Sequence, residues 1–147
     1  MRLTIGGRSY DDGRDISTRE FYDLLRAHPG EATTSAPSPA AFLDAFESAG
    51  QLTTSILCIV VAEQFSSTID SAQSASRQFK ELHPGHEIHV MDSGSAAGGE
   101  GLIAMEALDL IEAGRSLVEV AAESALVADR VRLLAFVDTL FYLWKGG

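Results

Sequence analysis

Two short hydroxyl-rich segments contain the residues of this chain best suited to bind a ligand. Residues 33–39 read Thr-Thr-Ser-Ala-Pro-Ser-Pro and residues 65–68 read Phe-Ser-Ser-Thr, each just ahead of a predicted helix. The start of a helix has unpaired backbone N–H groups and a partial positive charge, and Ser and Thr add hydrogen-bond donors without adding charge. Both segments are therefore predicted to be loops that bind an anionic head group, either a carboxylate or a phosphate. Their residue types also have a purely structural explanation, because Ser and Thr at helix starts most often serve as N-caps.

Other residues suggest chemistry that their spacing does not support. The histidines His83, His86 and His89 do not predict a metal site, because His83 begins a His-Pro-Gly turn and the other two would point to opposite faces of a strand. The single cysteine, Cys58, lies in the apolar run 56–61 and is interpreted as a buried strand residue. We expect neither a metal nor a cofactor.

Enzymatic activity is not expected either. The glycine-rich segment 98–101 lacks the Lys-Ser or Lys-Thr of a phosphate-binding P-loop, and the chain has no Gly-x-Ser-x-Gly nucleophile motif. A small hydrolase that uses Ser66 or Ser93 remains as a distant alternative. The chemistry of the chain is that of a binding protein.

The elements that must position these loops alternate between strand and helix. Hydrophobic periodicity and capping signals give this order: a strand at 2–6, a hairpin or turn at 8–13, helices beginning after Ser17 and Ser38, a strand at 56–61, a helix after the loop 62–67, a strand at 87–91, helices at 97–113 and after Ser116, a strand at 132–138 and final helical turns near Leu140. This order predicts an α/β fold, a three-layer domain with a mostly parallel sheet flanked by helices. Loops 62–68, 92–98 and 138–140 would follow the carboxyl ends of strands, the edge at which such sheets bind ligands.

Composition limits the partners of the chain. Its 147 residues are 46% hydrophobic, enough for one compact domain with a sizeable core, and carry a formal net charge of −10. Nucleic acids and anionic membrane surfaces attract clustered Lys and Arg, and no such cluster occurs. The longest apolar run, residues 56–62, is far shorter than the roughly 20 residues of a membrane helix, and the first residues do not resemble a signal peptide. We expect a soluble, cytoplasmic protein.

Four segments together resemble the DegV family of fatty-acid-binding proteins. The family's Thr-Ser-Gln-Pro-Ser loop is matched by residues 34–38, and its Leu-Ser-Gly-Thr-Tyr loop by residues 65–69. Its Asp-Ser and Gly-x-Gly positions are similar to residues 92–93 and 99–101, and its Asp-Thr-Leu-x-Tyr-Leu-x-Lys-Gly-Gly segment is matched by residues 138–147. The order and spacing of these segments carry the resemblance, which covers nearly the whole chain.

The resemblance implies a function and a set of site residues. In the family, the threonine of the first loop and the serine of the second hold the carboxylate of a fatty acid, which implies Thr34 and Ser66 converging on one cleft here. The full predicted ligand-binding set is Thr34, Ser35, Ser66, Ser67, Thr68, Asp92 and Ser93. The implied partners are a long-chain fatty acid and a fatty acid kinase, to which the protein would present the acid as a carrier.

The sequence also departs from the family pattern. Ala36 replaces a glutamine, Ser67 replaces a glycine, and Ala62 and Glu63 stand where the family usually has two serines; Glu63 would repel a carboxylate. Family members are longer, with a strand before the position of Met1 and a second domain after the Lys-Gly-Gly segment. Residues 1–147 are therefore expected to form a single DegV-like amino-terminal lipid-binding domain that lacks the family's first strand and its carboxyl-terminal domain.

A different class of function stays open beside lipid binding. A truncated structural or interaction domain would bind no lipid and would pair, as a homodimer, through the sheet edge that the absent first strand leaves open. Native mass spectrometry of protein purified from cells separates these alternatives, because it detects a co-purifying fatty acid, a dimer, or neither.

Overall fold

The computed structural model describes residues 1–146, which divide into two compact units. Residues Met1–Pro37, together with the stretch from Ala135 onward, form what we call the amino-terminal unit. Residues Ser38–Leu134 form the central unit.

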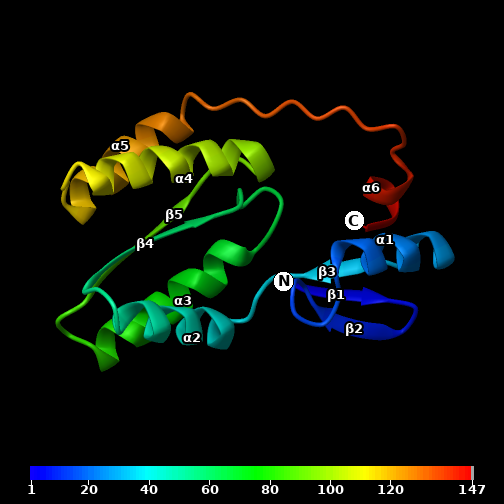
Figure 1. The fold of residues 1–147 in the computed structure, drawn as a ribbon, viewed down its shortest axis with the longest axis horizontal. Helices are drawn as coiled ribbons and strands as arrows, with labels where there is room; N and C mark the ends of the chain where they lie inside the picture. Colours follow the sequence, from blue (N-terminus) through cyan, green and yellow to red (C-terminus); the bar gives the residue numbers. More distant parts are fainter. Residues whose placement is uncertain (147) are drawn as a thin grey trace. The chain divides into compact units, whose positions relative to one another are not determined.

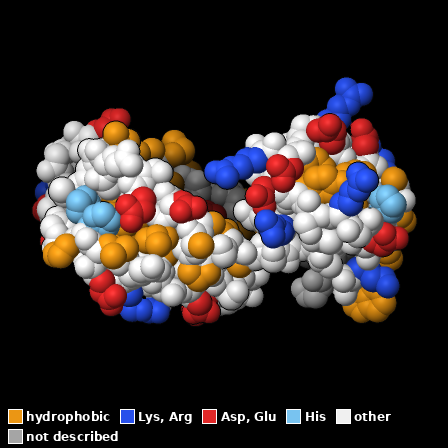
Figure 2. Space-filling model, turned by 90° about the horizontal axis from the view of Figure 1, so that it is seen from below, with side chains coloured by type: hydrophobic (Ala, Val, Ile, Leu, Met, Phe, Trp, Pro, Cys, Tyr) orange, Lys and Arg blue, Asp and Glu red, His pale blue; other side chains and the backbone are white. Residues whose placement is uncertain are grey.

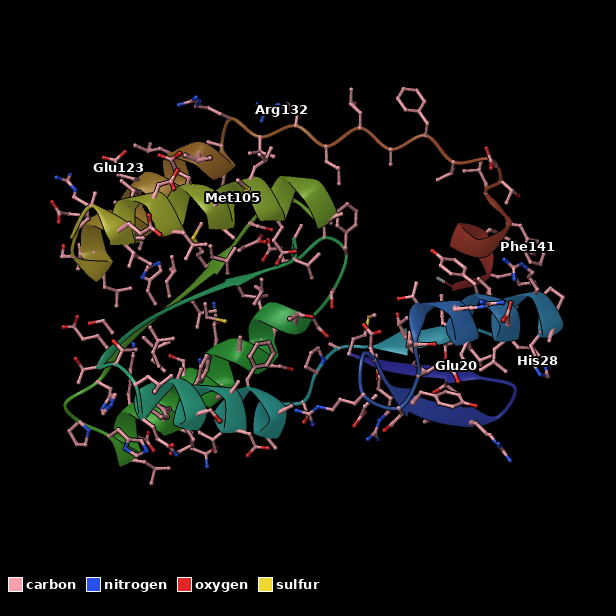
Figure 3. The ribbon with its side chains drawn as sticks, in the orientation of Figure 1. Glu20, His28, Met105, Glu123, Arg132 and Phe141 are labelled. Atoms are coloured by element: carbon pink, nitrogen blue, oxygen red, sulfur yellow. The ribbon has the colours of Figure 1, made fainter. Side chains whose placement is uncertain are left out.

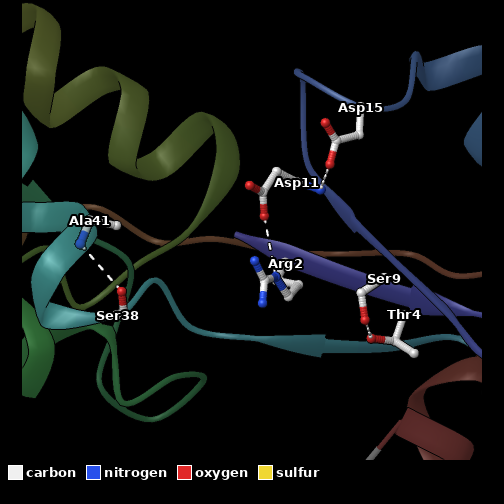
Figure 4. Close-up of polar contacts among 7 residues, drawn as sticks. All are labelled: Arg2, Thr4, Ser9, Asp11, Asp15, Ser38 and Ala41. Carbon is white, nitrogen blue, oxygen red and sulfur yellow. Dashed lines mark hydrogen bonds and ion pairs between the residues drawn. The ribbon is translucent and has the colours of Figure 1, made fainter.

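The amino-terminal unit is built on a small antiparallel sheet. Its strands β1 (Arg2–Ile5), β2 (Arg8–Asp11) and β3 (Thr33–Ser35) lie in the order β2-β1-β3. The turn between β1 and β2 is made by Gly6 and Gly7, whose positive φ angles of 55° and 75° suit glycine. Two cross-strand contacts support the hairpin, Arg2 Nε to Asp11 Oδ1 at 3.3 Å and Thr4 Oγ1 to Ser9 Oγ at 3.0 Å (Figure 4).

Two helices complete this unit. Helix α1 (Thr18–Ala27) begins with the predicted capping box, in which Ser17 Oγ accepts from the Glu20 N–H at 3.3 Å and Glu20 Oε2 accepts from the Ser17 N–H at 2.9 Å. Helix α6 (Phe141–Gly146) confirms the predicted final helical turns. The buried apolar residues of the unit are Leu3, Ile5 and Ile16.

The central unit is a parallel strand pair covered by helices. Strand β4 (Ser55–Val60) pairs in parallel with β5 (Glu87–Asp92), with Ser55 opposite Glu87 and Val60 opposite Asp92. Helices α2 (Pro39–Gly50) and α3 (Thr68–Leu82) lie on one side of this pair, and α4 (Ala97–Glu112) and α5 (Leu117–Ala128) lie on the other (Figure 1). This is the layering that apolar strands with helical crossovers produce.

The core of the central unit follows the predicted hydrophobic faces. Phe46 from α2 and Phe79 from α3 pack edge to face, with ring centroids 6.2 Å apart, against Ile56 and Ile88 of the strands. A second cluster contains Val60, Ile69 and Ala72. Ser38 caps α2 by accepting from the Ala41 N–H at 3.3 Å (Figure 4), so this helix begins where the sequence predicts.

Three predictions about the fold need correction. The α/β class is right, but the sheet is not mostly parallel: among the strands of residues 1–146, β4 and β5 pair in parallel, and β1, β2 and β3 pair antiparallel. Residues 33–35 were predicted to lie in a loop and form β3, since β1 offers them an open edge. The predicted strand at 132–138 is extended but is not a strand, because no neighbouring strand in the described chain pairs with its backbone. Residues 138–140 therefore do not follow a strand.

The surface agrees with the composition. Lys and Arg side chains on the face shown in Figure 2 are interspersed with Asp and Glu rather than gathered into one basic patch. Within residues 1–146, every helix is too short or too polar to cross a bilayer.

Candidate functional site

The loops that leave β4 and β5 are tied together at the carboxyl end of the strand pair. The Ala62 N–H donates to the Ser95 carbonyl at 2.8 Å, and the Ser93 N–H donates to the Val60 carbonyl at 3.0 Å. Helices α3 and α4 begin directly after these two loops. The β4–α3 and β5–α4 loops therefore form one ledge at the edge where α/β sheets bind ligands.

The start of α3 differs from the other serine-started helices. Ser17, Ser38 and Ser116 each accept a hydrogen bond from the N–H three residues on, as N-caps do. Ser67 occupies the N-cap position of α3, but its side chain makes no cap hydrogen bond. The Asp70 N–H donates to the Ser67 carbonyl at 3.2 Å, and the N–H groups of Thr68 and Ile69 keep their capacity for an anion.

The hydroxyls of Ser66 and Thr68 lie beside Ser67 at the same helix start. Ser66 Oγ and Thr68 Oγ1 are hydrogen-bonded to each other at 2.7 Å. Thr68 is buried, Ser66 is half-buried and Ser67 is exposed. The bond between the two hydroxyls fixes Ser66 Oγ, which has one donor and two acceptor positions and retains capacity for a ligand.

Asp92 and Ser93 are used inside the ledge. Asp92 Oδ1 accepts from the Glu63 N–H at 3.3 Å and from the Gly94 N–H at 3.0 Å, so it links the two loops. Ser93 is fully buried; its Oγ donates to the Ser95 carbonyl at 3.1 Å and accepts from the Ser95 N–H at 3.2 Å. In this arrangement both residues shape the loop, and their role as ligand contacts stays a prediction.

Thr34 and Ser35 lie on the exposed strand β3 of the amino-terminal unit. Thr34 pairs with Leu3 and Ser35 with Arg2 across the antiparallel ladder. Ser66, by contrast, belongs to the central unit. The convergence of Thr34 and Ser66 on one carboxylate therefore stays a prediction.

A groove beside the start of α4 was not predicted from the sequence. It has a volume of about 810 Å³ and is lined by residues of α4, the end of α5 and the segment after α5, among them Gly99, Leu102, Val127, Arg130, Val131 and Leu134. None of the seven predicted ligand-binding residues lines it. The available signal in the sequence was Gly98, where an added Cβ would meet no atom within 4 Å.

Two titratable groups near the ledge are perturbed by their surroundings. Burial, followed by the negative charge of Glu100, raises the pKa of the Cys58 thiol to about 11. Burial also raises the pKa of the Glu100 carboxyl above its ordinary value. Cys58 is therefore a poor nucleophile, as its apolar neighbours in the sequence indicate.

His83 and His86 of the central unit make their hydrogen bonds to helix α2 and not to the ledge. His83 Nε2 lies 3.0 Å from Glu47 Oε1, and His86 Nε2 lies 3.1 Å from the Gly50 carbonyl oxygen. No hydrogen bond within residues 1–146 joins Ser66 or Ser93 to a histidine. Over the same residues, no group of three or more His, Cys, Asp or Glu side chains is arranged to hold a metal ion.

Comparison with known proteins identifies the family. A family model described as an uncharacterised protein of the DegV family matches residues 1–147. The chain belongs to the DegV family. Among curated DegV domain-containing proteins, that of Caldanaerobacter subterraneus is 32% identical over the whole chain, and that of Deinococcus radiodurans is 31% identical over 141 residues. These alignments cover 51% and 48% of the relatives, so the chain spans about half the length of the curated proteins it matches.

Solved DegV structures share the fold. A DegV family protein from Thermus thermophilus, described as fatty-acid-binding, superposes with a TM-score of 0.74 at 29% identity over 87% of this chain and 44% of its own. The fatty acid kinase B3 protein of Streptococcus pneumoniae, solved with linoleic acid, gives a TM-score of 0.78 at 26% identity with the same coverage. The first of these relatives is described as binding fatty acid and the second as loaded with one.

Proposed function

We propose that this chain binds a long-chain fatty acid and holds its carboxylate at the start of α3. Ser66 is the main contact, with Ser67 and the N–H groups of the first turn as further donors. Thr34 and Ser35 are assigned to the same carboxylate through the resemblance to the family, because the structure describes their unit separately. The bound acid is presented to a fatty acid kinase.

The observation that carries the proposal is the uncapped start of α3. Serines that serve only the fold accept a backbone N–H, as Ser116 does, whereas the side chain of Ser67 accepts none and that of Ser66 is hydrogen-bonded to the Thr68 hydroxyl. A carboxylate supplies the missing acceptor and the negative charge that a helix start favours. The fatty acids described with the Thermus thermophilus and Streptococcus pneumoniae relatives supply the ligand class.

The groove beside α4 is the proposed place for part of the acyl chain. Its volume of about 810 Å³ lies within the roughly 300–1,000 Å³ of small-molecule sites. Burying a methylene contributes about 0.8 kcal/mol, and each head-group hydrogen bond to a charged ligand contributes about 1.5 to 3 kcal/mol. The tail therefore supplies most of the affinity, while the hydroxyls fix the orientation of the acid.

Replacing Ser66 by alanine tests the head-group site. Loss of one charge-assisted hydrogen bond is expected to weaken binding of a fluorescent fatty acid by roughly 10- to 100-fold and to change the melting temperature little. Ser116→Ala is the matched control, because that hydroxyl caps a helix outside the ledge. It should lower stability by about 1 kcal/mol without changing affinity. An unchanged affinity in Ser66→Ala with a clearly lower melting temperature would identify Ser66 as a structural residue only.

The carrier role needs its own experiment. The chain loaded with a radiolabelled fatty acid is incubated with ATP and a bacterial fatty acid kinase, and the expected result is an acyl phosphate that appears only when the chain is present. Ser66→Ala should reduce this product in proportion to its loss of binding. If the chain binds the acid but never supports its phosphorylation, the binding part of the proposal stands and the carrier part is wrong.

A further inference from the structure

The β4–α3 loop carries Ser66, the main carboxylate contact of the proposed function, and backbone hydrogen bonds hold the residues just before it. The Phe65 N–H donates to the Ala62 carbonyl at 2.9 Å, so residues 62–65 form a turn that ends directly before Ser66. The Ala62 N–H donates to the Ser95 carbonyl of the neighbouring loop at 2.8 Å. The position of Ser66 on the ledge therefore depends on the groups that fix this turn.

The carboxylate of Asp92 at the end of β5 is one of these groups. Its Oδ1 accepts from the Glu63 N–H at 3.3 Å and from the Gly94 N–H at 3.0 Å, so one oxygen atom binds a backbone group of each loop. An ionised acceptor makes stronger hydrogen bonds than a neutral one. Because Glu63 lies inside the turn 62–65, Asp92 fixes that turn directly.

Ser93 fixes the same turn from its other partner. Its Oγ donates to the Ser95 carbonyl at 3.1 Å and accepts from the Ser95 N–H at 3.2 Å. This Ser95 carbonyl is the acceptor of the Ala62 N–H. Ser93 is fully buried, so a ligand on the ledge does not reach its hydroxyl.

We propose that Asp92 and Ser93 are positioning residues of the fatty-acid site. They hold the turn 62–65 so that the Ser66 hydroxyl is fixed at the start of α3, and they do not contact the carboxylate of the ligand. The inference rests on the proposed function for the identity of that ligand. Electrostatics favour it, because an Asp92 carboxylate at contact distance would repel the carboxylate of a fatty acid.

Two substitutions at Asp92 separate positioning from contact. Asp92→Asn removes the charge but keeps an oxygen acceptor for the two N–H groups, whereas Asp92→Ala removes both. Asp92→Ala should weaken binding of a fluorescent fatty acid about tenfold, and Asp92→Asn should retain most of the affinity. If Asp92 faced the ligand, both variants would bind more tightly than wild type, because each removes a repelling charge. Tighter binding by both variants, or unchanged binding by Asp92→Ala, would overturn the proposal.

The buried hydroxyl of Ser93 gives a second variant that acts on the turn from the other side. Ser93→Ala removes the hydroxyl that holds the Ser95 loop, and it should weaken fatty-acid binding in the same direction as Asp92→Ala. Because the Ser93 side chain is fully buried, this loss cannot come from a contact with the ligand. Unchanged affinity in Ser93→Ala would exclude a positioning role for Ser93.

Glu123 provides the matched controls for the change in charge. It is an exposed residue of α5, outside the ledge (Figure 3). Glu123→Ala and Glu123→Gln repeat the two kinds of change made at Asp92 and should leave the affinity for the fatty acid unchanged. If they shift the affinity as the Asp92 variants do, the effect arises from net charge and the positioning role is wrong.

Hydrogen exchange of the ligand-free chain tests the positioning role without any fatty acid. NMR at single residues should show the Ala62 and Glu63 amides exchanging about tenfold faster in Asp92→Ala than in wild type, and near the wild-type rate in Asp92→Asn. The Val120 amide, which donates to the Ser116 carbonyl in α5, is the reference and should not change. Unchanged exchange at Ala62 and Glu63 would overturn the proposal. A wild-type chain that binds no fatty acid would refute the proposed function, and these exchange rates would still decide whether Asp92 fixes the turn.

Discussion

The surroundings of Cys58 lower the reactivity of its thiol in the folded chain. Because burial raises its pKa from the ordinary 9.0 to about 11, the thiolate fraction at pH 8 falls roughly a hundredfold. Iodoacetamide should therefore alkylate Cys58 in the folded chain at least roughly a hundredfold more slowly than in urea. Mass spectrometry of timed samples measures both rates. The structure makes Cys58 half-buried rather than buried as predicted, and similar rates in the two states would contradict even this partial burial on β4.

Glu100 is a second residue whose burial has a measurable consequence. Its pKa is raised in the folded chain, so its ionisation destabilises the fold as pH rises above the ordinary value of 4.5 through the raised folded value. Glu100→Gln should therefore gain stability relative to wild type at pH 7 and show little difference at pH 4. Urea unfolding at both pH values measures this. Glu106→Gln, at an exposed position of α4, controls for the loss of one negative charge. If Glu100→Gln were more stable than wild type at pH 4 but not at pH 7, the expected pH dependence of the free energy of unfolding would be wrong.

The predicted site residues differ in how much of their role was visible in the sequence. The hydroxyl pattern located Ser66 and Ser67 at a helix start, and the structure places them there. It gave no sign that Asp92 links the two loops through the Glu63 N–H or that Ser93 hydrogen-bonds within its own loop, since such contacts depend on backbone conformation elsewhere in the fold. Residue types identified candidates, and geometry separated the available hydroxyls from those already used.

At the scale of elements, glycine spacing in α4 determines how closely the β5–α4 loop can pack. A Cβ at Gly99 would collide with Ser95 Oγ and lie 3.1 Å from Val131 Cγ1, whereas a Cβ at Gly101 would meet nothing within 4 Å. Gly99→Ala should therefore lower the free energy of unfolding by about 1 to 3 kcal/mol. Gly101→Ala is the control and should raise it by up to about 1 kcal/mol, because alanine favours a helix. Urea unfolding of both variants measures these changes. If both variants are more stable than wild type, the β5–α4 loop has room for a Cβ at residue 99.

Elements with local signals were predictable, and those that depend on a distant partner were not. The capping boxes at Ser17 and Ser116 gave the starts of α1 and α5 because their hydrogen bonds lie within four residues. The apolar run at β4 gave a strand because its partner β5 is available. Residues 132–138 have an equally strong strand pattern, but a pattern does not supply the neighbouring strand that the backbone needs. For the same reason β3 escaped prediction, since its pairing is determined by β1 and not by its own Thr-Thr-Ser sequence.

At the scale of the whole molecule, the groove beside α4 determines how tightly the 147-residue chain can hold an acyl tail. Leu102 and Leu134 line the groove and remain 59% and 81% exposed, so its wall is open to solvent in this chain. A tail lying there buries one side and leaves the other in water. If about six methylenes stay unburied, about 5 kcal/mol of binding free energy is lost, which is more than a thousandfold in affinity.

We therefore expect the 147-residue chain, as a monomer, to bind a fluorescent fatty acid far more weakly than the fatty-acid-binding Thermus thermophilus relative, of which it covers 44%. Titrations of both proteins in the same buffer, combined with sizing chromatography, measure affinity and oligomeric state together. If a second copy covers the groove, affinity should rise with protein concentration in step with the dimer fraction. A strictly monomeric chain that binds as tightly as the longer relative would show that its groove closes over the tail without further protein.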